Sequence, residues 1–68
     1  SMLVSEFGEP FFENDLKIPP GKYYHFLEYC KPLGIEDLFR QNRKIELIYI
    51  LRKESVSYLE LLDKAEEE

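Results

Sequence analysis

The sequence predicts an all-α fold: a small domain of three helices, or four short ones if the middle helix is broken, behind an irregular N-terminal segment. Apolar residues recur at i, i+3, i+4 and i+7 in three stretches after residue 20. Proline, glycine and serine separate these stretches, and the chain of 68 residues is 44% hydrophobic, which is too apolar for a disordered tail. We therefore divide the chain into an irregular segment, 1–19, and a helical domain, 20–68.

Acidic residues alternate with large apolar ones in the stretch from residue 5 to residue 17, where Gly8 and Pro10 interrupt any regular period. We expect this stretch to be extended or irregular. Phe11, Phe12 and Leu16 should pack onto the helices that follow, because large apolar groups are costly to leave in water. The alternative is that the stretch is a motif that binds a partner groove, since acidic and hydrophobic residues also alternate in such segments.

The first helix is expected to run from Pro20 or Gly21 to about Lys31. Proline is tolerated in the first turn of a helix, where its missing N–H has no partner to lose. Pro32 and Gly34 should end the helix, the first by restricting the residue before it and the second by allowing a left-handed exit. The apolar face of this helix consists of Tyr23, Phe26, Leu27 and Cys30.

The second helix is expected over residues 35–53. Its acidic first turn and basic last turn suit the helix macrodipole. A break near Gln41 and Asn42 would split it in two, because Asn is a good N-cap. A buried strand over 45–51 is the alternative that we consider weaker, because helix-forming residues flank it. The helical stripe consists of Ile35, Leu38, Phe39, Asn42, Ile45, Ile48, Tyr49 and Arg52.

A turn is expected at Glu54–Val56, followed by a third helix. Ser57 and Glu60 have the spacing of a capping box, in which each side chain accepts a backbone N–H at the start of a helix. The third helix would present one apolar stripe, made of Val56, Leu59, Leu62 and Ala65.

Charge is segregated along the chain, although the net charge is -5. Residues 1–16 and residues 60–68 each carry -4, whereas residues 17–59 carry +3. The basic centre permits attraction to the acidic ends, within one chain or between two. Nucleic-acid binding normally requires a basic patch and a high pI, so the pI of about 4.8 argues against it for this chain alone. No apolar run reaches the length of a membrane span, and we expect no membrane partner.

The candidate chemical groups do not assemble into a site. A single Cys cannot form an intramolecular disulfide. One Cys and one His together cannot supply the four ligands of a zinc site. His25 and Cys30 point apart on a helix, because five residues rotate about 140°. His25 and Glu28 share a helix face and would form at most half of a metal site. We expect no catalytic, cofactor-binding or metal-ligating residues, no cofactor and no enzymatic activity.

The aromatic content of 15% is the most informative excess, because tyrosines are enriched at protein interfaces. It favours a protein-protein interaction or oligomerisation module of an intracellular regulatory protein, with a homodimer preferred slightly to a different protein partner. Ser1 before Met2 is not the order of natural initiation, so we expect a piece of a longer protein. The predicted interaction face consists of Tyr23, Tyr24, Phe26, Leu27, Phe39, Ile45, Ile48, Tyr49, Leu59 and Leu62.

Two stretches carry faint resemblances. Residues 43–62, RKIELIYILRKESVSYLELL, resemble the first two helices of winged-helix regulators: an apolar helix, a short turn with serine and a leucine-rich helix. The resemblance implies an alternative function, a partial helix-turn-helix piece of a nucleic-acid-associated regulator, without the recognition helix and wing that contact the nucleic acid. Residues 26–39, FLEYCKPLGIEDLF, resemble the opening of sterile-alpha-motif interaction domains through their Leu-Gly-Ile step.

Overall fold

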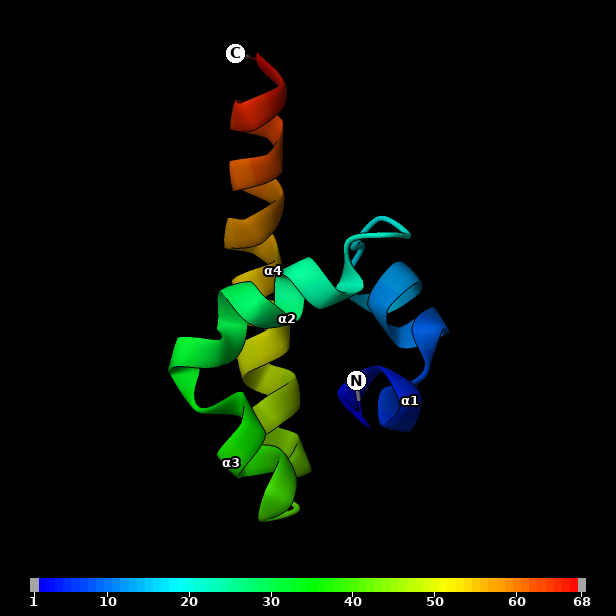
Figure 1. Cartoon of the computed structure of the whole chain (residues 1–68), viewed down its shortest axis with the longest axis vertical. Coiled ribbons are helices and arrows are strands. Elements are labelled where there is room, and N and C mark those ends of the chain that lie inside the picture. Colours follow the sequence, from blue (N-terminus) through cyan, green and yellow to red (C-terminus); the bar gives the residue numbers. More distant parts are fainter. Residues whose placement is uncertain (1, 68) are drawn as a thin grey trace.

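The computed structural model describes residues 2–67, and this part of the chain is helical without any strand. A long C-terminal helix, α4 (Lys44–Glu67), forms the long axis of the molecule, and the shorter elements lie against its lower and middle parts (Figure 1). α2 (Tyr23–Cys30) crosses α4 near its middle, and α3 (Ile35–Arg40) lies beside its first turns. The expected all-α class is therefore confirmed.

The N-terminal segment is helical, so the expectation of an irregular segment over 1–19 is wrong. It forms α1 (Met2–Phe7) and a short π-helix, η1 (Phe11–Asp15). Gly8, with φ 84°, ends α1 by donating its N–H to the carbonyl of Val4. Gly8 and Pro10 therefore separate two short helical pieces, where the sequence pattern suggested that they prevent helix altogether.

Aromatic packing explains why this segment is ordered. The ring centroids of Phe7 and Phe11 are 5.1 Å apart, those of Phe11 and Phe12 5.6 Å, and those of Phe12 and Tyr23 5.4 Å. The rings thus form a continuous series from α1 through η1 to α2. Phe12 and Leu16 are fully buried and Phe11 is partly buried, which confirms that these three residues pack onto the helices.

Two ion pairs hold the acidic N-terminal segment against α4. Lys44 Nζ lies 3.5 Å from Glu6 Oε1, and the Arg52 guanidinium lies 3.8 Å from an Asp15 carboxylate oxygen. All four side chains are largely exposed, so each pair contributes little to stability. They show that the acidic N-terminal end is attracted to the basic centre within the same chain.

The first predicted helix ends close to its expected bound, but it begins later than expected, because Pro20 and Gly21 form a turn before it and not its first turn. α2 starts at Tyr23 and passes into a 3₁₀ turn, η2 (Lys31–Leu33). Lys31 keeps helical dihedral angles although Pro32 follows it, so the proline does not stop the helix. Gly34, at φ 78°, makes the expected left-handed exit.

The second predicted helix is broken where the sequence allowed a break. Asn42 has a φ of 58° between α3 and α4, so it acts as a left-handed link and not as an N-cap. Arg43 follows it and forms two side-chain hydrogen bonds with Glu46, of 2.9 and 2.6 Å, at the start of α4.

The expected turn at Glu54–Val56 does not exist, because α4 is continuous over 24 residues. Ser55 is buried, and its hydroxyl donates to the carbonyl of Arg52 at 2.8 Å. Leu51, Ser55 and Tyr58 lie on one face under α2. Tertiary packing of this face fixes the helix and overrides the local preference of serine for caps and turns. Ser57 and Glu60 lie inside the helix and cap nothing.

Candidate interaction surface

The ten residues of the predicted interaction face do not form one surface. Tyr23, Phe26 and Leu27 belong to the core cluster of buried residues. Phe39, Ile48, Leu59 and Leu62 are partly buried. Only three members are well exposed: Tyr24, Ile45 and Tyr49. Helical periodicity identifies an apolar stripe but does not say whether the stripe faces the core or the solvent.

Three exposed apolar residues of α4 form a stripe on the outer side of the helix, whereas Leu61, which is 51% exposed, lies on another side. Ile45 is 83% exposed, Tyr49 67% and Val56 58%. Their spacing of four and seven residues places them on one face of an α-helix. We name Ile45, Tyr49 and Val56 the outer stripe. The sequence pattern places Val56 on the apolar face of a separate third helix. Val56 lies on the same face as Ile45 and Tyr49 only because α4 is continuous.

The outer stripe begins at a shallow hollow in the first turns of α4. Ile45, Glu46, Tyr49 and Ile50 line it. Glu46 is held by Arg43 at the edge of this hollow, so the exposed apolar side chains adjoin a fixed charged pair. An aliphatic or aromatic side chain of a binding partner would contact apolar groups in this hollow, and polar groups would surround it. Many protein interfaces have such an apolar centre and a polar rim.

Charge along α4 changes sign near its middle. Residues 44–53 carry a net +2, and residues 54–67 carry a net -4. The last turns of α4 extend beyond α2 without a neighbouring element (Figure 1), and most of their side chains are exposed. Within residues 2–67, neither Lys53 nor Glu60 takes part in an ion pair, in contrast with the paired Lys44 and Arg52.

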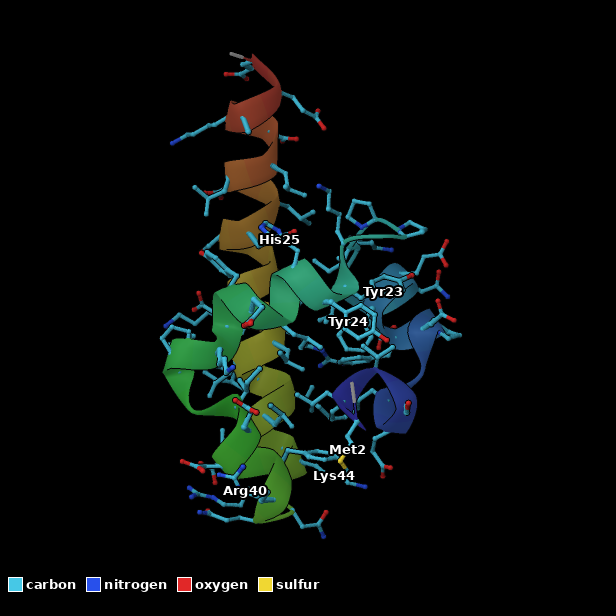
Figure 2. All side chains as sticks on the ribbon, in the orientation of Figure 1. Met2, Tyr23, Tyr24, His25, Arg40 and Lys44 are labelled. Carbon is cyan, nitrogen blue, oxygen red and sulfur yellow. The ribbon has the colours of Figure 1, made fainter. Side chains whose placement is uncertain are left out.

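A second hollow lies where α1, α2 and the start of α3 meet. Its apolar lining comes from Leu3, Tyr24, Leu27 and Ile35, and its volume is about 280 Å³. Figure 2 shows the ring of Tyr24 on α2, on the side toward α1. This volume is at the lower end of the range for small-molecule sites, roughly 300–1,000 Å³.

Charged groups line the rim of this second hollow. Lys31 Nζ is 3.9 Å from a Glu28 carboxylate oxygen and 4.0 Å from one of Glu36. The three side chains are more than half exposed, so the rim is solvated and contributes little binding energy to a charged ligand.

The single histidine contacts α4 and not the cysteine. His25 Nδ1 lies 2.6 Å from the hydroxyl oxygen of Tyr58, and Figure 2 shows the imidazole lying over α4. In the neutral tautomer that carries its proton on Nε2, the hydroxyl of Tyr58 donates to Nδ1. Burial raises the pKa of Tyr58, which keeps this hydroxyl protonated as a donor. The sequence offered no signal for a pair separated by 33 residues.

The remaining nucleophile is inaccessible. Cys30 is fully buried, as its place on the apolar face of the first predicted helix indicated. Burial, with a smaller contribution from the charge of Glu54, raises the pKa of the Cys30 thiol to about 12. A thiol that stays protonated and lies out of contact with solvent is a poor nucleophile.

Two further features concern only the described residues. No group of three or more His, Cys, Asp or Glu side chains in residues 2–67 is arranged to hold a metal ion. In the same range, no helix combines the length and the apolar character that crossing a bilayer requires. His25 contacts Tyr58, and Glu28 lies 3.9 Å from Lys31 Nζ.

Comparison with protein-family models, with curated proteins and with solved structures finds no match to this chain.

Proposed function

We propose that this chain is an intracellular protein-protein interaction module that docks through the outer stripe of α4. The observation that carries the proposal is the exposure of Ile45, Tyr49 and Val56 on one helix face. Single exposed apolar residues are common on protein surfaces. Three on one stripe, with one of them aromatic, are typical of a surface that another protein covers.

The helix that carries the stripe is rigidly held, which favours binding. Leu47, Leu51 and Tyr58 on the opposite face of α4 are buried in the core. The outer stripe therefore does not have to become ordered when a partner binds, and little conformational entropy is lost. Tyr49 suits a central role, because tyrosine offers a large rigid ring with few rotatable bonds.

The chemistry of the other candidate groups favours a non-catalytic role. The Cys30 thiol is buried and its pKa is raised to about 12, and His25 is engaged by Tyr58. A single buried cysteine also suits an intracellular protein, because small secreted domains usually depend on disulfides. No observation favours the helix-turn-helix alternative, since the two helices and the turn that suggested it over residues 43–62 are one helix.

Site-specific photo-crosslinking tests this function. A benzophenone amino acid replaces Tyr49 in one variant and Leu33 in a control, because Leu33 is an exposed apolar residue of η2 outside the outer stripe. Irradiation in the cell of origin should give a discrete crosslinked species from position 49 and none from position 33. The added substitution Val56→Asp should abolish that species without changing the circular dichroism of the purified chain. Equal crosslinking from both positions, or none from position 49, would refute the outer stripe as a docking surface.

A further inference from the structure

We propose that the partner of the outer stripe is a second copy of this chain, bound with its α4 antiparallel to the first. This inference rests on the proposed function and names its partner. The argument comes from the spacing of residues along α4 and from the change in the sign of charge along it.

The outer stripe continues toward the C-terminus with heptad spacing. Ile45, Tyr49, Arg52, Val56, Leu59 and Asp63 succeed one another at alternating intervals of four and three residues. This spacing keeps a single face of a helix turned toward a neighbouring helix. Leu59 is partly buried and Val56 is exposed, so together they form the apolar centre of this face.

The sign change of charge along α4 selects the antiparallel orientation. A parallel pair would place Lys53 beside Lys53 and Glu60 beside Glu60, which is repulsive. In an antiparallel pair the basic first part of each helix meets the acidic second part of the other. The acidic N-terminal segment already pairs with Lys44 and Arg52 within the chain, and Glu46 pairs with Arg43. By contrast, Glu54, Glu60 and Asp63 in the second part of α4 form no ion pair with another described residue.

Of the antiparallel registers that keep the heptad positions opposite one another, two place Val56 opposite the heptad residue next to it, Arg52 or Leu59. If Val56 faces Arg52 of the partner subunit, Lys53 of both copies meet at the twofold axis, and the basic residues repel. If Val56 faces Leu59 of the partner subunit, Arg52 faces Asp63 of the partner subunit and Lys53 flanks Glu60 of the partner subunit. The second register places opposite charges on both sides of an apolar centre, so we assign the pair to it.

The face of α4 that carries the heptad positions is turned away from the buried face that packs on α2. The last turns of α4 extend beyond α2 (Figure 1). The overlap of two copies falls largely on residues 52–63, and α2 packs on the opposite face of this part of α4, where Leu51 and Tyr58 are buried. Of the outer stripe, Val56 lies inside the overlap, Tyr49 lies at its edge near the last turn of the partner helix, and Ile45 lies outside it.

Charge reversal tests the register. Sedimentation of the chain from about 1 µM to about 500 µM should show a monomer-dimer equilibrium. Lys53→Glu and Glu60→Lys should each weaken the dimer by at least about tenfold, because each creates two like-charge contacts around the twofold axis. The two changes in one chain should restore most of the affinity. Lys22→Glu, which alters net charge equally at an exposed position in the α2 cap, is the matched control and should have little effect.

Directed disulfides test the orientation. Chains carrying Arg52→Cys are mixed with chains carrying Asp63→Cys, one of them tagged for size. The antiparallel pair brings these positions together, so the mixed disulfide should form readily under mild oxidation. In that pair, two copies of either position are roughly 16 Å apart along the axis, too far for a disulfide. The native Cys30 is buried and does not interfere.

Several outcomes would overturn the inference. A chain that stays monomeric over the whole concentration range, or a dimer indifferent to both charge reversals, contradicts it. Disulfides between identical positions would show a parallel pair. Crosslinking of position 49 to a different protein by a chain that stays monomeric would remove this inference and leave the proposed function standing.

Discussion

The side chains of His25 and Tyr58 connect α2 to the middle of α4, with 2.6 Å between His25 Nδ1 and the Tyr58 hydroxyl oxygen. The Tyr58 ring also packs on Phe26 and Tyr29, with ring centroids 5.2 and 5.4 Å away. The Tyr58 side chain thus contacts both the polar side of α2, at His25, and its apolar side, at Phe26. This contact lies where the sequence suggested a new helix beginning near residue 57, and it helps to keep α4 continuous there.

We expect Tyr58→Phe to lower the free energy of unfolding by about 0.5–1.5 kcal/mol, because it removes one hydrogen bond and keeps the ring. Urea denaturation measures this loss. Tyr24→Phe is the matched control, since Tyr24 is 58% exposed, and it should change stability far less. Equal effects of the two substitutions would contradict a stabilising role for the contact with His25.

We expect Val56→Pro to lower the free energy of unfolding by about 3 kcal/mol or more, because proline in a helix interior removes a hydrogen bond and clashes with the preceding turn. Val56→Ala should be nearly neutral, since the side chain is largely exposed and alanine favours helix. Thermal denaturation followed by circular dichroism distinguishes the two. If proline were tolerated as well as alanine, a turn at Glu54–Val56 would replace the continuous helix.

We expect the native chain to lose stability as the pH rises above about 9, toward 12. The pKa of the Cys30 thiol is raised by burial from 9.0 to about 12, so the unfolded chain binds fewer protons than the folded one in this window. The stabilising contribution is complete below the lower value and is lost as the pH rises. Cys30→Ala should show a shallower fall in urea midpoint between pH 9 and pH 10 than the native chain. The same slope in both would show that Cys30 does not contribute.

Two tyrosines also contribute to the loss of stability at high pH, so the effect of Cys30 is measured as the difference between the native chain and Cys30→Ala. Burial raises the pKa of Tyr58, and burial with the charges of Glu13 and Glu9 raises that of Tyr23. Both groups remain in Cys30→Ala, so their part of the alkaline destabilisation should persist in that variant.

We expect Phe12→Leu to lower the free energy of unfolding by about 1 kcal/mol or more, because Phe12 is fully buried between η1 and α2. Phe11→Leu should cost less, since Phe11 is only partly buried. Urea denaturation of both variants tests the packing of the N-terminal segment. An unchanged stability for Phe12→Leu would show that this segment does not belong to the core, and would favour the alternative of a partner-binding motif.

The outer stripe illustrates the limit of helical periodicity. Tyr23 and Tyr49 both lie on apolar stripes in the sequence, yet the first is buried and the second is largely exposed. The difference depends on which side of each helix meets its neighbours, and sequence spacing contains no information on that. The predicted interaction face therefore combined core residues with surface residues and omitted Val56.

The sequence by itself determined the helical class, the exit at Gly34 and the burial of Phe12, Leu16 and Cys30, because these depend on local dihedral preference and on hydrophobicity. It allowed the break near Asn42 without deciding it. Only the tertiary structure decided that the N-terminal segment is helical and that α4 runs through Ser55. Stacked phenylalanine rings order the first, and packing of Leu51, Ser55 and Tyr58 under α2 stabilises the second. Both depend on contacts between distant residues, whose energies outweigh the local preferences of glycine, proline and serine.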